Sequence, residues 1–230
     1  MPTCYIVGAA EMDQTFHPEE TDFTIAADAG LRHLRRLGIQ PDLIIGDFDS
    51  LGSVPPQPQV VCFPPEKDDT DMMLAVKAGL KKGYTDFRLY GGLGGRLDHT
   101  LANIQALLYL AHHQAQGFLI GEGMVLTAIT NGSLRIKEGK KGILSVFCFG
   151  EPATGINLTG LKYPLHDATL TSDMALGISN EFTDNPAEIS VKNGTLVILW
   201  FDERFDDQSV SIIRFPRYKD YSSASSFRTL

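Results

Sequence analysis

Cysteine is scarce in this chain, with three in 230 residues. Cys4, Cys62 and Cys148 are far apart and lie in apolar runs. This spacing excludes the compact cysteine patterns of a disulfide framework or a zinc motif. We therefore expect free, buried cysteines in a reducing compartment.

Positive charge is also in short supply. There are 20 Lys and Arg against 28 Asp and Glu, which gives a formal net charge of −8 and a pI near 5.2. Nucleic acid binds to basic surfaces, so we expect no nucleic-acid partner. An acidic protein that handles a polyphosphate must bring cations between the like charges.

Long apolar runs are missing, and the segment from Met1 to Cys4 has no basic region followed by a long apolar stretch. We therefore expect no membrane partner and no secretory signal, and a cytoplasmic enzyme is the default. The chain has neither a G-x-G-x-x-G fingerprint nor a Walker loop. Any nucleotide site must be built in another way.

In the first half, apolar runs alternate with segments of helical composition. Strands are expected at Tyr5–Ala10, Phe23–Ala27, Leu43–Ile45, Val60–Phe63, Phe87–Tyr90, Phe118–Ile120 and Met124–Ile129. Helices are expected at Ala29–Leu37, Thr70–Lys82 and His99–Gln114, the last with Leu101, Ile104, Leu107, Leu108 and Ala111 on its apolar side. The alternation predicts an α/β N-terminal domain, residues 1–129, with a mainly parallel sheet.

From Asn131 the pattern changes to short apolar or alternating runs. The dipeptides between them are typical of turns: Asn131-Gly132, Lys141-Gly142, Thr154-Gly155 and Asn193-Gly194. This predicts an all-β, sandwich-like C-terminal domain over residues 130–205. Residues 206–230 are expected to add a strand at Ser209–Phe215 and then a disordered, Ser-rich tail.

Polar clusters follow several of the expected strands. They are Asp28, the Asp47–Ser50 stretch, the Asp68–Asp71 cluster and the Gly91–Asp98 loop. In parallel sheets ligands bind beyond the carboxyl ends of the strands. We therefore expect these clusters to meet at one edge of the sheet.

Two of the clusters suggest a bound cation and a bound phosphate. Asp47 and Asp49 are two residues apart, so in extended backbone both carboxylates reach one side and suit Mg²⁺. An Asp-rich turn that caps the next segment is the alternative. The Asp68–Asp71 cluster precedes a helix that Thr70 or Asp69 would cap, and helix N-termini attract phosphate.

The glycine-rich loop also indicates phosphate binding. Four glycines in the five residues from Gly91 leave backbone N–H groups bare, and Arg96 adds a cationic fork for phosphate oxygens. Asn103 is expected to face back toward the loop. A flexible turn is the alternative interpretation.

Taken together, several segments resemble the thiamine pyrophosphokinase family. They are Ala26–Gly30, Gly46–Ser50, Lys67–Asp71, Gly94–His99 with Asn103, and Gly177–Phe182. The resemblance covers nearly the whole chain to about Phe201. It implies an α/β domain, a β-sandwich domain, a homodimer, and transfer of diphosphate from ATP to thiamine to give AMP and thiamine diphosphate.

The resemblance also implies roles for individual residues. Asp47, Asp49 and Asp71 would hold Mg²⁺, and Ser179 and Asn180 would contact thiamine across a domain or subunit junction, although an ordinary polar turn there remains open. From the chemistry of the transfer, and not from the resemblance, Asp71 or Asp68 could accept the hydroxyl proton. The nucleotide and phosphate site would comprise Asp28, Lys67, Asp68, Thr70, Gly94, Gly95, Arg96, Asp98, His99 and Asn103.

Three other functions remain open. A diphosphokinase of a pterin alcohol could use the same scaffold. A phosphatase of the haloacid dehalogenase type has a D-x-D-x-T motif similar to Asp47–Ser50, but its nucleophile follows the first strand rather than about the third. A nucleotide-binding sensor would bind ATP without turnover.

Overall fold

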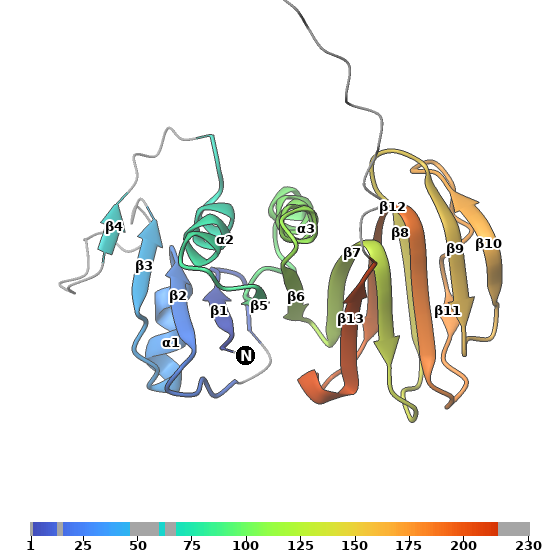
Figure 1. The fold of residues 1–230 in the computed structure, drawn as a ribbon. Helices are drawn as coiled ribbons and strands as arrows, with labels where there is room; N and C mark the ends of the chain where they lie inside the picture. The colour runs from blue at the N-terminus through green and yellow to red at the C-terminus, as the bar shows by residue number, and fades with distance from the viewer. Residues whose placement is uncertain (1, 13–15, 47–59, 63–67, 216–230) are drawn as a thin grey trace, which may run out of the picture.

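The computed structural model describes residues 2–12, 16–46, 60–62 and 68–215, with backbone alone for 60–62. In these residues thirteen strands form one sheet, in the order β10-β9-β12-β7-β6-β5-β1-β2-β3-β4, with β8, β11 and β13 attached beside this path. Three α-helices accompany it in the described part of the chain (Figure 1). None of the described helices is long and apolar enough to cross a membrane.

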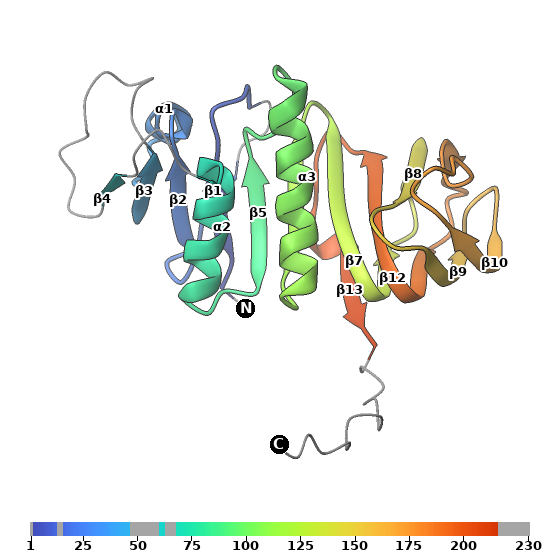
Figure 2. The ribbon, with the colours of Figure 1, turned by 90° about the horizontal axis from the view of Figure 1, so that it is seen from above.

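The first half of the sheet is parallel. Its strands are β1 (Cys4–Val7), β2 (Phe23–Ala27), β3 (Leu43–Gly46), β4 (Val60–Cys62), β5 (Asp86–Tyr90) and β6 (Gln116–Gly121). The helices are α1 (Gly30–Leu37), α2 (Asp71–Lys81) and α3 (Leu97–His112). Figure 2 shows α2 and α3 side by side over the sheet.

Helices cover both faces of this parallel part. In β1, Cys4 and Ile6 pack into the cluster that contains α2 and α3, whereas Tyr5 and Val7 pack into the cluster that contains α1. Successive strand residues point to opposite faces, so a strand covered on both sides must be apolar throughout. This explains the uninterrupted apolar runs of the first half.

The second half is antiparallel throughout. Its strands are β7 (Met124–Ile136), β8 (Ile143–Cys148), β9 (Ala153–Thr159), β10 (Leu165–Leu170), β11 (Asn180–Glu181), β12 (Ala187–Phe201) and β13 (Val210–Arg214). β7 also pairs with β6 and so joins the two halves into one mixed sheet. It passes through the expected domain boundary at residue 129, and the division into domains stays a prediction.

Three of the expected turns are wrong. Asn131-Gly132 lies inside β7, Asn193-Gly194 inside β12 and Thr154-Gly155 inside β9. The first two dipeptides face each other where the pairing shifts register between Val191 and Thr195. Asn131 takes a φ of 47°, and its side-chain oxygen accepts a hydrogen bond from Gly194 N at 3.0 Å. The residues that favour left-handed backbone here form a bulge instead of ending a strand.

The expected apolar face of the third helix is partly wrong. Leu107 and Ala111 are buried, but Leu101 is 51% exposed. The buried side is centred on Ala106, Leu107 and Leu110. At about 100° per residue, Leu101 lies on the opposite side of the helix from Leu110.

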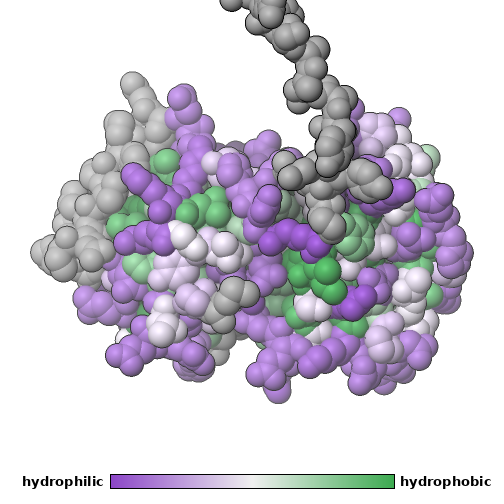
Figure 3. All heavy atoms as spheres, in the orientation of Figure 1, coloured by the Kyte–Doolittle hydropathy of each residue, from purple (hydrophilic) through white to green (hydrophobic). Residues whose placement is uncertain are grey.

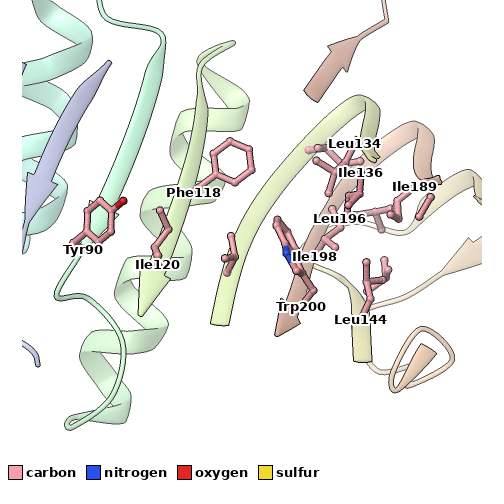
Figure 4. Packing of buried hydrophobic residues seen from close by; sticks show 14 of the residues in the cluster. Tyr90, Phe118, Ile120, Leu134, Ile136, Leu144, Ile189, Leu196, Ile198 and Trp200 are labelled. Carbon is pink, nitrogen blue, oxygen red and sulfur yellow. The ribbon is translucent and has the colours of Figure 1, made fainter. Parts of the chain in front are cut away.

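The described cysteines and the end of the described chain agree with expectation. Cys4 and Cys148 are free and buried. Trp200 is fully buried in the apolar cluster of Figure 4. The extra strand expected at Ser209–Phe215 is β13, which pairs with β7. Hydrophilic residues predominate on the face shown in Figure 3.

Candidate active site

A cavity of about 520 Å³ lies at the carboxyl ends of the parallel strands. It is bounded by the segments that follow β1, β2 and β5 and by the starts of α2 and α3. Its lining comprises Gly8, Ala9, Ala10, Ala27, Asp28, Thr70, Asp71, Met72, Gly91, Gly92, Gly94, Gly95, Arg96, His99 and Asn103. Polar segments that are distant in sequence therefore meet at one edge of the sheet.

The segment after β1 forms a wall that the sequence had not indicated. Gly8 N donates to Tyr90 O at 2.8 Å, and Ala10 N donates to Gly91 O at 2.9 Å. A Cβ on Gly8 would lie 2.6 Å from Gly91 O, so only glycine permits this approach. The available signal was a glycine at the end of the first strand, without any further motif.

Asp28 stands directly after β2 and lines the cavity. Its backbone is left-handed, with a φ of 51°, and its N–H donates to Ile45 O at 2.7 Å. Aspartate tolerates this conformation better than most residues. The hydrogen bond to β3 fixes the backbone that carries the carboxylate.

The start of α2 brings Thr70 and Asp71 to the cavity. Thr70 is the N-cap, as expected, and its hydroxyl accepts from Met73 N at 3.2 Å. Asp69 instead pairs with Lys77 at 2.6 Å. Among the three aspartates of the Asp68–Asp71 cluster, Asp71 lines the cavity, whereas Asp68 and Asp69 do not.

The glycine loop after β5 forms another side. Gly91, Gly94 and Gly95 have φ values of 60°, 78° and 66°, which L-residues with side chains rarely adopt. Asn103 is buried, and its side-chain nitrogen donates to Gly92 O at 2.7 Å. The expected approach of Asn103 to the loop is therefore confirmed.

Arg96 follows the loop and is held by Asp98. Their closest contact is 2.6 Å, from Arg96 Nη2 to Asp98 Oδ2, and both side chains are exposed. Hydrogen bonding from Arg96, with a further bond from His99 N, lowers the pKa of Asp98 to about 2. His99 also lines the cavity. The pair fixes a guanidinium at the cavity rim.

Ser179 and Asn180 are not brought to this cavity within one chain. They lie at β11, toward the far end of the antiparallel half (Figure 1). Asn180 is buried and holds Tyr163: its oxygen accepts from Tyr163 N at 2.9 Å, and its nitrogen donates to Tyr163 O at 2.7 Å. Ser179 is exposed, and its backbone N–H donates to Ser145 Oγ.

Asp47, Asp49 and Lys67 lie outside the described residues. Within the described part of the chain, no three His, Cys, Asp or Glu side chains form a metal-binding group. Two carboxylates, from Asp28 and Asp71, nevertheless share one cavity. Their oxygens are the kind of ligand that hard cations prefer.

These features suit a polyphosphate with its cation. The bare glycine backbone and the helix N-termini offer N–H groups to phosphate oxygens, and Arg96 adds positive charge. The two carboxylates would repel a bare polyphosphate and require a cation between them. The D-x-D segment follows β3, the third strand, which does not suit an aspartyl phosphatase of the haloacid dehalogenase type.

Known proteins match both halves of the chain. The family model "Thiamin pyrophosphokinase, catalytic domain" matches residues 17–119, and "Thiamin pyrophosphokinase, vitamin B1 binding domain" matches residues 133–196. A thiamine pyrophosphokinase of Bacillus subtilis is 31% identical over 194 residues, which cover 81% of this chain and 91% of the relative.

Solved structures agree. The crystal structure of thiamine pyrophosphokinase from Bacillus subtilis matches with a TM-score of 0.77 and 29% identity, covering 88% of this chain and 100% of that chain. The enzyme from Geobacillus thermodenitrificans matches with a TM-score of 0.74 and 27% identity, covering 90% and 99%. The chain therefore belongs to the thiamine pyrophosphokinase family of diphosphotransferases.

Proposed function

We propose that the cavity binds ATP and directs its β phosphorus toward the hydroxyl of thiamine, with AMP as the leaving group. One observation carries the proposal: Asp28, Asp71, Arg96 and the glycine loop meet in a single cavity at the carboxyl ends of the parallel strands. That is where open α/β sheets bind their ligands.

In this proposal Asp71, with Asp47 and Asp49, holds Mg²⁺. The fit is supported by the two carboxylates that line the cavity. When bound, the ion supplies positive charge that offsets the phosphates. Asp28, which also lines the cavity, contacts the nucleotide.

The remaining groups bind and orient the phosphates. N–H groups of the glycine loop and of the first turn of α2 donate to phosphate oxygens. Arg96, held by Asp98, stabilises charge on the transferred or leaving group. His99 and Asn103 support the loop. Lys67 and Asp68, in the segment before α2, are proposed to bind phosphate, although Asp68 does not itself line the cavity. Of the two candidate bases, Asp71 is favoured because it lines the cavity and Asp68 does not.

Thiamine is proposed to reach this cavity through a second copy of the chain. Ser179 is exposed. It follows two exposed apolar residues, Leu176 at 57% and Ile178 at 44%, and it precedes the buried Asn180. A homodimer would place Ser179 and Asn180 of one protomer beside the cavity of its partner. The acidic cavity suits thiamine, because the thiazolium ring is a permanent cation.

This arrangement assigns residues 1–129 to nucleotide and metal binding and residues 130–205 to thiamine binding and dimer formation. A cytoplasmic location is proposed with it. The match of residues 133–196 to a vitamin B1 binding domain favours thiamine over a pterin alcohol.

Product analysis tests the proposal. With ATP, Mg²⁺ and thiamine the protein should form AMP and thiamine diphosphate, and EDTA should stop the reaction. Asp71→Asn should lower kcat by about 100-fold or more. The matched control is Asp69→Asn, the neighbouring acid that pairs with Lys77 outside the cavity, which should stay active. ADP with thiamine monophosphate as products, or an active Asp71→Asn variant, would contradict it.

A further inference from the structure

The segment from Glu203 to Phe215, which we call the C-terminal strap, lies beyond the residues matched by the vitamin B1 binding model. It contains a short 3-10 helix, Asp207–Ser209, and β13. Asp206 caps that helix by accepting a hydrogen bond from Gln208 N at 3.0 Å. The strap therefore has a defined structure of its own.

Asp207 of the strap pairs with Arg88 of β5. The side chain of Arg88 is only 5% exposed. Arg88 Nε donates to Asp207 Oδ1 at 2.6 Å, and Nη1 donates to Asp86 Oδ1 at 2.5 Å. Asp86 alone could balance the charge, but Asp207 satisfies a different N–H of the buried guanidinium. A buried donor that loses its acceptor is costly.

Phe205 of the strap packs beside Arg88 as well. Its ring centroid lies 5.1 Å from that of Phe118 on β6 and 6.3 Å from that of Trp200 on β12. The Arg88 guanidinium lies 4.7 Å from the Phe118 centroid and 5.9 Å from that of Phe205. Figure 4 shows Phe118 on β6 and Trp200 on β12, and β7 lies between these two strands. The strap thus packs against strands of both halves of the sheet.

β13 fixes the far end of the strap. It runs antiparallel to residues 132–136 of β7, and Phe215 N donates to Asn131 O at 2.8 Å. The first part of β7 pairs instead with β6. The strap is therefore attached to β7 at one end and to β5 through Asp207 at the other.

β5 leads directly into the glycine loop. Arg88 precedes Gly91 by three positions, about 10 Å of extended chain. We propose that the C-terminal strap positions the glycine loop, with Asp207 as the positioning residue, because its contact with Arg88 holds β5 in place. The consequence for ATP rests on the proposed function, in which this loop binds phosphate.

Asp207→Ala in the full chain tests this. Amide hydrogen exchange should become faster in residues 91–95, and the KM for ATP should rise by at least about three-fold while kcat changes less. Asp207→Asn keeps an oxygen that can accept from Arg88 Nε and should restore much of both properties. The matched control is Ile212→Ala, in the same strap but opposite Leu134 of β7, which should lower Tm without either effect.

Unchanged exchange of the loop in Asp207→Ala would overturn the proposal, and so would an equal increase in Ile212→Ala. Faster exchange with an unchanged KM for ATP would support the strap and overturn the assignment of ATP phosphates to the loop. The two proposals therefore fail in different ways.

Discussion

Replacing Gly8 by alanine should weaken ATP binding in a protein that still folds. The added Cβ would lie 2.6 Å from Gly91 O and 2.9 Å from Met72 Cε. The methionine can move, but the carbonyl oxygen is backbone and accepts a hydrogen bond from Ala10 N at 2.9 Å. The end of β1 or the glycine loop must therefore shift.

The cost follows from this contact. Overpacking of this kind destabilises a fold by about 1–3 kcal/mol. In a chain of this size 1 kcal/mol corresponds to about 2–4 °C, so Tm should fall by about 2–12 °C. Misplacement of a phosphate-binding loop by a fraction of an ångström should raise the KM for ATP by about ten-fold.

Steady-state kinetics and calorimetry measure both quantities. All samples should have the same protein concentration, since the Tm of the proposed dimer would depend on it. Gly38→Ala is the control. Gly38 ends α1 with a φ of 70°, and a Cβ there would meet nothing within 4 Å. Backbone strain of about 1–2 kcal/mol should lower its Tm without changing the KM for ATP. A wild-type KM in Gly8→Ala, or the same increase in Gly38→Ala, would refute the reasoning.

Three further variants probe single contacts. The pKa of Asp98 lies below its usual 3.8, at about 2, so the Arg96 pair stabilises the fold above pH 4 and this stabilisation is lost as the pH falls through about 2. In Arg96→Gln, a carboxyl NMR titration should show the midpoint of Asp98 move up toward 3.8. An unmoved midpoint would exclude the pair in solution. Ser179→Ala should raise the KM for thiamine but not the KM for ATP. Asn180→Ala should instead lower Tm, because the backbone of Tyr163 loses two hydrogen bonds. If Ser179→Ala changed only the KM for ATP, Ser179 would belong to the nucleotide site.

Much of the parallel half could be predicted from the sequence, because a strand buried on both faces must be apolar and a helix needs a cap and a stop. Phe23–Ala27 agrees residue by residue, Thr70 caps α2, and Gly38 ends α1. The position of Asp28 and Asp71 around one cavity followed from the rule that parallel strands end at the same edge. The chemical roles of these residues stay predictions.

The antiparallel half was harder, because glycine dipeptides signal left-handed backbone without saying whether a chain turns or bulges. Asn131-Gly132 and Asn193-Gly194 meet across two long strands, and only the pairing reveals it. Leu101 shows the same limit in a helix, since an apolar residue at a helix start need not share the phase of the buried face. The wall formed by Gly8 depends on a backbone approach that no local pattern encodes.

The sequence alone also could not show that the Ser179 motif and the cavity lie far apart within one chain. The motif containing Ser179 lies with β8 and β11, while the cavity lies at the ends of the parallel strands. Motif order along a chain carries no information on which copy completes a site. A second protomer is the simplest way to bring both substrates together.

A crystal structure with Mg²⁺ and a non-hydrolysable ATP analogue tests the central claim most directly. The phosphates should lie against the glycine loop and the first turn of α2, within reach of Arg96, with the ion bound by Asp71. Phosphates bound elsewhere on the chain, with Asp71 and Arg96 far from both ion and nucleotide, would contradict it.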